Sequence, residues 1–270
     1  MSQQNEHPDL VWMLFLGSAL FKLGHYEDAI TTLKYATEID PQSTVAHYRL
    51  GRILLELERY DEALEEYQSV VELDPRDVYA YNGLGDVYKA QEAFEKAIAA
   101  YQRAIEINPH DDYAHKRLGN LYYMQGQVDE AIVHQKRAIE LDPQDAFPHN
   151  RLGIIYQAQG KLQEALQEHN QAIALAPARG LYRTGLISLL RKMGRDDEAN
   201  KQTKIAHDLM AKEAEYDRAC FEAIEGNAKD ALAFLKTALD KRQVSVDWVL
   251  RDPDLESLHN HPRLKALTAF

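Results

Sequence analysis

The sequence predicts an all-α protein in which short helical hairpins of one kind stack into a solenoid. The first observation is a Leu-Gly pair that returns every 34 residues, with its glycine at positions 17, 51, 85, 119 and 153. The second is that alanine, from Ala29 to Ala165, and proline, from Pro41 to Pro177, return at the same interval without insertion or deletion. Fixed spacing of this kind is typical of repeat proteins, whose units bury their apolar faces only against their neighbours.

Each unit is expected to form two amphipathic helices, over about its first fourteen residues and over about residues 18–31 of the repeat. In the fourth unit, Leu118 and Gly119 mark the buried side of the first helix, and Ala131 marks that of the second. The small residues let the helices approach closely, and the large ones fill the space around them. Gly126 suits the turn between the helices, and Pro143 ends the second helix because the residue before a proline avoids the α conformation.

The repeated positions resemble those of the tetratricopeptide repeat, in which a bulky residue, Leu-Gly, Tyr, Ala and a closing Pro recur. One unit reads DYAHKRLGNLYYMQGQVDEAIVHQKRAIELDPQ, from Asp112 to Gln144. The resemblance covers residues 10–177 as five regular repeats and implies a right-handed α-solenoid of helix-turn-helix repeats. It also implies that the first helices line a concave groove and that the protein is a scaffold for protein–protein interaction.

Outside the five regular repeats the pattern weakens. Residues 1–9 are expected to form a polar N-terminal tail, residues 178–211 a divergent sixth repeat, and residues 212–242 a divergent seventh. Residues 243–270 resemble the terminal segment of many bacterial members of the family and are expected to cap the solenoid. Two short helices, each with a proline near its start, would bury four leucines there: Leu255, Leu258, Leu264 and Leu267.

The composition favours a globular protein without chemistry of its own. Apolar residues make up 45% of the chain and charged residues 27%, with a formal net charge of −12. The sequence contains no phosphate-binding glycine loop, no G-x-S-x-G and no H-E-x-x-H, so we predict no enzyme, no cofactor and no metal site. His47, His115 and His149 hold the bulky position of their repeats and are expected to pack there in place of tryptophan, rather than to bind metal or sense pH.

The predicted compartment is the cytoplasm. The single cysteine, Cys220, has no partner for a disulfide and no ligands at zinc spacing, which indicates a reducing environment. The polar start of the chain lacks the basic residues of a secretory signal. The apolar run that follows is shorter than the roughly twenty residues that cross a membrane, so no membrane insertion is predicted.

The predicted groove is basic although the chain is acidic. Residues 1–177 hold 15 basic and 28 acidic side chains, but the groove positions of the second to fifth repeats hold six basic and two acidic ones. This separation of charge would attract an acidic ligand. We therefore predict that the groove binds a peptide segment of another protein, extended or helical, and either acidic or ending in a free carboxylate. The aromatic rings would pack on the apolar parts of its side chains, the asparagines would form hydrogen bonds with its backbone, and the cations would form ion pairs with its carboxylates. The residues concerned are Tyr48, Arg49, Arg52, Tyr79, Asn82, Lys89, Tyr113, Lys116, Arg117, Asn120, Tyr123, Phe147, Asn150 and Arg151.

Some members of the family, such as co-chaperones of the heat-shock system, hold a C-terminal carboxylate with a two-carboxylate clamp. Lys116 and Asn120 match the first Lys and Asn of that clamp. The later repeats depart from it, with Arg151 in place of an asparagine and with Leu181 and Gly185 in place of Lys and Arg. The sequence therefore does not predict the complete clamp.

The first repeat indicates a different contact. Its groove positions include Val11, Leu14, Phe15 and Phe21, an apolar patch at an end of the solenoid where a polar cap is usual. The alternative function is therefore a self-assembling oligomer that uses this patch, unless residues 1–9 or the curvature of the solenoid cover it. A minor alternative is RNA binding, because a basic groove with one ring per repeat suits base stacking. The acidic total and the lack of a basic tail argue against nucleic acid.

Overall fold

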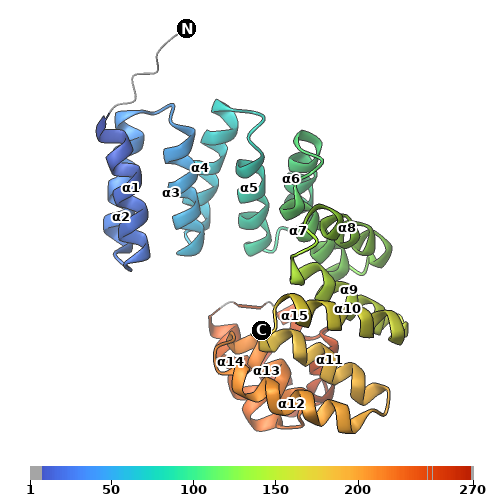
Figure 1. Ribbon diagram of the computed structural model, residues 1–270. Coiled ribbons are helices and arrows are strands. Elements are labelled where there is room, and N and C mark those ends of the chain that lie inside the picture. The colour runs from blue at the N-terminus through green and yellow to red at the C-terminus, as the bar shows by residue number, and fades with distance from the viewer. Residues whose placement is uncertain (1–7, 242, 245, 269–270) are drawn as a thin grey trace. The chain divides into compact units, whose positions relative to one another are not determined.

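The structure is a computed structural model that describes residues 8–241, 243–244 and 246–268. Within these ranges the chain forms α-helices joined by short turns, one short 3₁₀ helix and no β-strand (Figure 1). The all-α class predicted from the repeat is confirmed. The elements are α1 (Pro8–Lys22), α2 (Tyr26–Ile39), α3 (Thr44–Glu56), α4 (Tyr60–Leu73), α5 (Val78–Ala90), α6 (Phe94–Ile107), α7 (Asp112–Met124), α8 (Val128–Leu141), α9 (Ala146–Ala158), α10 (Leu162–Leu175), α11 (Gly180–Lys192), α12 (Asp196–Met210), α13 (Glu215–Ile224), α14 (Ala228–Asp240), α15 (Val246–Val249), η1 (Pro253–Leu258) and α16 (Pro262–Leu267).

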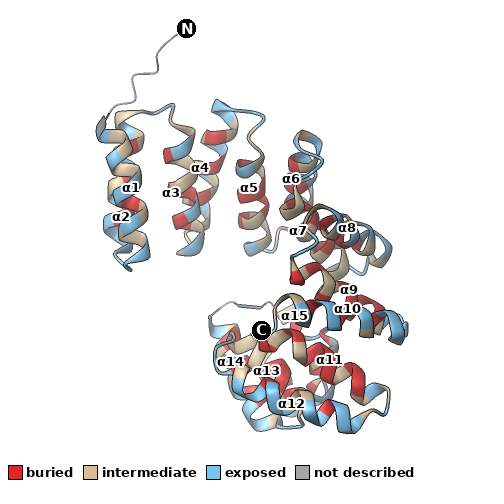
Figure 2. Cartoon of the chain, viewed as in Figure 1, coloured by how far each residue is buried: buried red, intermediate tan, exposed pale blue. Residues whose placement is uncertain are grey.

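The chain divides into two compact units, residues 1–121 and residues 122–270, and the first turns of α7 belong to the first unit. In that unit α1 packs on α2, α3 on α4 and α5 on α6, and α2 and α4 also pack on the helix that follows each of them. The stacked hairpins bury a continuous apolar core, red in Figure 2, whose most completely buried large side chains include Leu33, Leu50, Leu54, Tyr67 and Tyr101.

Glycines make room for the rings that fill this core. Tyr67 comes from α4, and its ring lies against Gly51 of α3 and Gly83 of α5. A Cβ atom at position 83 would lie 2.5 Å from the ring, closer than real side-chain carbons approach. Tyr101 of α6 takes the same place against Gly85. The ring of Tyr67 therefore joins the two helices of one repeat to the first helix of the next.

The turn between the two helices of a repeat needs a left-handed backbone. Gly126 has a φ of 78° there and Gly160 a φ of 74°, which glycine adopts without strain. The second and third repeats place Glu58 and Glu92 at this position, with φ values of 60° and 58°. A side chain in this conformation costs roughly 1–2 kcal/mol, so two turns of the first unit are strained.

The second unit is built from hairpins of the same kind. Here α9 packs on α8 and α10, α11 on α10 and α12, and α13 on α14. The imidazole of His169, from α10, takes the place that the tyrosine ring has in the first unit, between Gly153 of α9 and Gly185 of α11.

The C-terminal segment closes the last apolar cluster. Leu255, Leu258 and Leu264 are buried against α13 and α14, and Leu267 packs half-buried on the same cluster. The first of the two short helices is η1, a 3₁₀ helix, and the second is α16. Each of these two helices begins after a residue whose side chain caps it. The Asp252 carboxylate accepts a hydrogen bond from the backbone N–H of Asp254 at the start of η1.

Candidate functional site

Two of the rings predicted for the groove, Tyr48 and Tyr79, lie side by side on the first unit. The ring of Tyr48 on α3 lies with its centroid 6.1 Å from that of Tyr79 on α5 and 5.8 Å from that of Tyr67. Tyr79 keeps 68% of its surface exposed. We call the side chains of α3, α5 and the first turns of α7 on this side the first-unit face: Tyr48, Arg52, Tyr79, Asn82, Asp86, Tyr113 and Arg117.

Asp86 organises the centre of the first-unit face. Its carboxylate accepts from the hydroxyl of Tyr101 at 2.7 Å and from that of Tyr113 at 2.5 Å. Arg117 places Nε 3.4 Å from the same carboxylate, donates to the Tyr113 hydroxyl at 2.6 Å and stacks 4.6 Å from that ring. Burial raises the pKa of the Tyr113 hydroxyl, so this group stays protonated and donates to Asp86. The predicted cation Arg117 is therefore engaged by an acid and a ring of its own chain.

Two further cations of the predicted groove are also engaged within the first unit. Arg49 donates to the backbone oxygen of Leu14 at 2.7 Å and to the Ser18 hydroxyl at 3.2 Å, which fixes α3 to α1. Lys116 forms an ion pair with Asp112 at 2.9 Å, one turn earlier on α7. Lys89 and Asn120 lie half-buried on α5 and α7.

Arg52 differs from these cations. It is exposed, and among the described residues it forms neither a hydrogen bond nor an ion pair. Burial raises the pKa of the Tyr48 hydroxyl, and the charge of Arg52 opposes that rise, so the guanidinium lies within electrostatic range of this ring. Arg52 is thus an exposed cation near the half-buried ring of Tyr48, which in turn contacts the exposed ring of Tyr79.

Asn82 supplies a buried amide to the same face. Its side chain is 7% exposed, and Nδ2 donates to the carboxylate of Asp111 at 2.6 Å. Within the described part of the chain its Oδ1 is buried without a hydrogen-bond partner. A buried acceptor without a partner costs about 1–3 kcal/mol, so this amide is held at some cost to stability.

The remaining predicted residues lie in the second unit, and we call them the second-unit face: Tyr123, Phe147, Asn150 and Arg151. The guanidinium carbon of Arg151 lies 4.9 Å from the centroid of the Phe147 ring. Arg151 Nε and Asn150 Oδ1 are buried, and neither has a hydrogen-bond partner among the described residues. Burial raises the pKa of Tyr123 to about 12.

Two of the three histidines of the bulky position contact the second helices of their repeats. His47 contacts Glu66 through Nδ1 at 2.6 Å, and His149 contacts Glu168 in the same way at 2.6 Å. The hydrogen bond to Glu66 raises the pKa of His47 in spite of burial. His115 is buried on α7.

The apolar residues predicted for self-association divide between the core and the surface. Leu14 and Phe21 pack on the core, and Val11 is half-buried. Phe15 is 64% exposed. It belongs to a stripe along the outer side of α1 that the sequence reasoning missed, formed by Trp12, Phe15, Leu16 and Leu23.

Leu16 identifies the origin of this stripe. It opens the series of Leu-Gly leucines, and its counterparts Leu50 and Leu84 are buried where the second helix of the preceding repeat covers the next hairpin. No described helix precedes α1, so Leu16 stays 51% exposed. Comparing the burial expected at the first repeat with that at the inner repeats would have revealed the stripe.

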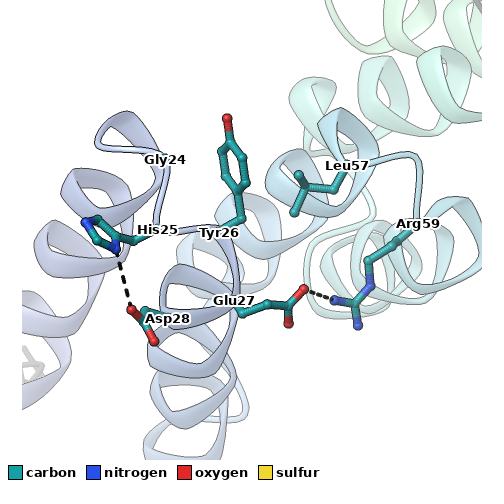
Figure 3. A pocket seen from close by; sticks show the side chains of 7 residues that line it. All are labelled: Gly24, His25, Tyr26, Glu27, Asp28, Leu57 and Arg59. Atoms are coloured by element: carbon teal, nitrogen blue, oxygen red, sulfur yellow. Dashed lines mark hydrogen bonds and ion pairs between the residues drawn. The ribbon is translucent and has the colours of Figure 1, made fainter. Parts of the chain in front are cut away.

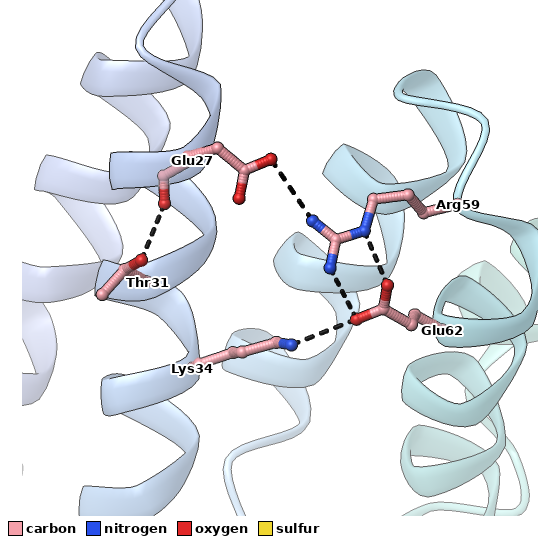
Figure 4. A network of polar contacts seen from close by, with 5 residues as sticks. All are labelled: Glu27, Thr31, Lys34, Arg59 and Glu62. Carbon is pink, nitrogen blue, oxygen red and sulfur yellow. Dashed lines mark hydrogen bonds and ion pairs between the residues drawn. The ribbon is translucent and has the colours of Figure 1, made fainter.

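A recess of about 500 Å³ opens beside the turns of the first two repeats. Its walls are Gly24, His25, Tyr26, Glu27, Asp28, Leu57 and Arg59 (Figure 3). Arg59 donates to both oxygens of Glu62, at 2.6 and 2.8 Å, and lies 3.5 Å from Glu27 (Figure 4). Lys34 donates to Glu62 at 3.1 Å. The charges beside the recess thus neutralise one another and tie α2 to the start of α4.

The hairpins stack on one another, and a ring from one repeat fits between the glycines of two neighbouring first helices. This arrangement defines the class of helical-repeat proteins. Models of the tetratricopeptide repeat match residues 14–78, 48–112, 100–133, 119–160 and 149–179. The chain belongs to the tetratricopeptide repeat family, as the sequence resemblance indicated. Repeats of this family form a scaffold for protein–protein interaction that is generally non-catalytic.

Solved structures share the fold. A tetratricopeptide repeat protein of Parabacteroides merdae is 18% identical, with 93% of this chain and 99% of that one aligned at a TM-score of 0.69. A thermophilic one of Thermus thermophilus is 28% identical over 62% of this chain and 92% of that one, at a TM-score of 0.52. YrrB, described as having an unusual peptide-binding site, is 20% identical over 67% of this chain and 93% of that one, at a TM-score of 0.53. The predicted α-solenoid is thereby confirmed.

Comparison with curated proteins gives no match. Over the part of the chain that the structure describes, no helix combines the length and the apolar character that crossing a membrane requires.

Proposed function

We propose that the protein binds an acidic peptide segment of a partner protein on its first-unit face, without chemistry of its own. The observation that carries this proposal is Arg52, an exposed cation beside Tyr48 and the largely exposed Tyr79 that makes no ion pair with the described residues. A guanidinium beside aromatic rings suits a carboxylate whose apolar stem lies on the rings. The peptide-binding description of YrrB supports this use of the fold.

Asn82 keeps the place of a backbone contact in this proposal. Its Oδ1 is covered by the chain's own atoms, so a peptide N–H would reach it only once the side chain turns outward. The cations Arg49, Lys116 and Arg117 already have partners in the chain, so they shape the face, while Arg52 supplies the charge that attracts the ligand.

The test is the fluorescence anisotropy of a labelled acidic peptide of glutamate and tyrosine, amidated at its C-terminus. We expect an affinity on the order of micromolar that weakens with salt. Arg52→Glu should weaken it by about tenfold or more, because a hydrogen bond to a charged group is lost. The matched control is Arg76→Glu, which makes the same change of charge at an exposed residue before α5.

Three outcomes would contradict this function. They are no binding to the wild type, an equal loss in both variants, and equal binding of a peptide with lysine in place of glutamate. A second peptide with a free C-terminus tests the carboxylate, since tighter binding of this form would identify a C-terminal ligand. Binding of a single-stranded RNA in place of the peptide would instead support the nucleic-acid alternative.

A second candidate function is self-assembly through the stripe on α1. In the inner repeats the position of Leu16 is covered by a helix, and a second copy offers such a helix with the same stripe. One symmetric contact between two α1 helices would cover both stripes. Two aromatic side chains and two leucines from each copy bury on the order of 1,000 Å², near the lower limit of a specific interface.

Sedimentation at several concentrations tests this candidate. We expect the wild type to associate as its concentration rises and Phe15→Glu to stay monomeric. The matched control is Val133→Glu, because Val133 is also 64% exposed but stands alone on α8. Monomers of all three proteins at every concentration would rule out self-assembly. Residues 1–9 are the other expected cover of this patch, and of these residues 1–7 lie outside the described residues.

We also propose that the protein works in the cytoplasm. The buried free thiol of Cys220 suits a reducing compartment. Fractionation of the native host, with the protein detected by antibody, tests this location, and recovery in a secreted fraction would contradict it.

A further inference from the structure

The C-terminal strap, residues 246–258, lies on the second-unit face. It comprises α15, the turn after it and η1. The ring of Trp248 lies 5.9 Å from that of Tyr123 at an interplanar angle of 67°, an edge-to-face pair. Arg251 donates to the backbone oxygen of Met124 at 3.3 Å, across 127 residues of sequence. The chain's own segment therefore contacts Tyr123, a residue that the sequence assigned to a partner peptide.

The other side of the strap is anchored in the second unit. Val249, Leu255 and Leu258 are at most 2% exposed and pack with α13 and α14. The Asp252 carboxylate accepts from the Tyr216 hydroxyl at 2.5 Å and from the backbone N–H of Asp254 at 2.9 Å. The strap is thus buried against α13, whereas its contacts with the end of α7 include the half-buried Trp248 ring and the exposed Arg251.

The strap also brings acidic groups toward the cation of this face. Burial and the neighbouring Asp252 raise the pKa of Asp254, and the charge of Arg151 opposes the rise. Burial raises the pKa of Asp217 on α13 to about 6, again against Arg151. Arg151 itself makes no hydrogen bond or ion pair with the described residues. It faces acids of its own chain without being locked to one of them.

We propose that the second-unit face is a peptide site that the strap occupies in cis, and that a partner segment with the same spacing of tryptophan and aspartates displaces it. The proposal rests on the proposed function in that both treat these faces as peptide sites. The ligand class is an aromatic, acidic segment, because Trp248 on Tyr123 and the aspartates near Arg151 are the contacts that such a segment would reproduce. In the resting protein the strap closes this face.

The affinity of the face depends on how often the strap is open. An edge-to-face aromatic pair contributes a factor of about two to ten to the closed state. The apparent affinity for a peptide in trans rises by the same factor when that pair is removed, because it scales with the open fraction. Trp248 lies outside the buried cluster that holds the strap to α13, so its truncation releases the end near α7 and leaves the cluster intact.

The probe is a fluorescein-labelled peptide with the strap sequence, VDWVLRDPDLESL, added to the full chain. Trp248→Ala should bind it about two- to tenfold more tightly than the wild type does. Tyr35→Ala, at a half-exposed ring of α2 outside both faces and the α1 stripe, should match the wild type. Adding Arg151→Glu to Trp248→Ala should abolish the gain, and a probe with alanine in place of tryptophan should bind more weakly. Equal affinity of Trp248→Ala and wild type, or binding that survives Arg151→Glu, would overturn the proposal.

Hydrogen exchange gives an independent readout. In Trp248→Ala the amides of residues 122–127 should exchange faster, while those of α13 and α14 keep their protection. Faster exchange throughout α13 and α14 would show that the strap is an inseparable part of the core, which overturns the proposal. All these variants except the control Tyr35→Ala lie in the second unit, so their failure leaves the Arg52 test of the first-unit face unaffected.

Discussion

His169 gives the fold a sensitivity to acid that one substitution should remove. This imidazole is completely buried between Gly153 and Gly185, and neither of its ring nitrogens has a hydrogen-bond partner among the described residues. Burial alone lowers its pKa from 6.5 to about 4. The first repeat holds a leucine, Leu33, at the equivalent position, also fully buried against a glycine. His169→Leu is therefore a change for which the protein already has room.

The size of the effect follows from the two pKa values. The unfolded chain binds a proton near pH 6.5 and the folded chain only near pH 4, so acid favours unfolding between these values. A difference of about 2.5 units corresponds to about 3 kcal/mol once both states are protonated, and about 2 kcal/mol is already lost at pH 5. The contribution of the neutral His169 to the free energy of unfolding is thus fully present above pH 6.5 and is lost as the pH falls toward 4. Near pH 8 the leucine should be at least as stabilising, because it buries no unpaired nitrogen.

The assay is urea unfolding followed by circular dichroism at several pH values from about 8 to about 5. Because repeat arrays depart from two-state unfolding, the midpoint difference between variant and wild type is the quantity to compare. This difference should grow in favour of His169→Leu as the pH falls. His207→Leu, at an exposed histidine of α12, should follow the wild type at every pH. A midpoint difference that stays constant with pH would refute the assignment of acid sensitivity to His169.

Three smaller changes test other parts of the fold. Gly83→Ala should destabilise the protein by roughly 1–3 kcal/mol, because the added carbon meets the ring of Tyr67; an unchanged denaturation midpoint would show that the ring can shift. Glu92→Gly should stabilise it by about 1 kcal/mol by relieving the left-handed turn, and a lower melting temperature would argue against strain there. Because Glu66 raises the pKa of His47, their pair stabilises the fold most at low pH and less as the pH rises through the folded value. The loss on His47→Gln should therefore be larger at about pH 5 than at about pH 8, and the opposite trend in midpoint differences would exclude this role.

The repeat was predictable from the sequence because its spacing records steric needs that recur in every unit. The Leu-Gly pair reflects a close approach of helices, so Gly51 and Gly85 could be placed before any coordinates were known. The roles of the cations could not be placed in this way. Asp86 on α5 forms an ion pair with Arg117 on α7 and accepts a hydrogen bond from Tyr101 on α6. The repeat pattern assigns each of these residues to a position in its own repeat and does not predict that they meet.

Two other features could not be predicted from the repeat pattern, for physical reasons. The exposure of Leu16 depends on a neighbour that is absent from the described residues, whereas the repeat pattern describes a unit with neighbours on both sides. The contact of Trp248 with Tyr123 joins segments far apart in sequence, and no local signal marks either residue for the other. The terminal helices were predictable because Pro253 and Pro262 mark their starts.

The position of Tyr67 between two glycines also limits how neighbouring repeats can move. Its ring belongs to one hairpin and fits against a glycine of the next, so sliding of one hairpin along the other would require the ring to withdraw from its socket. Tilting about the ring keeps both contacts. We therefore expect the hairpins of the first unit to tilt about these buried rings and not to slide past one another. The unit would then adapt to a ligand by small changes of the angle between hairpins, shared among several repeats.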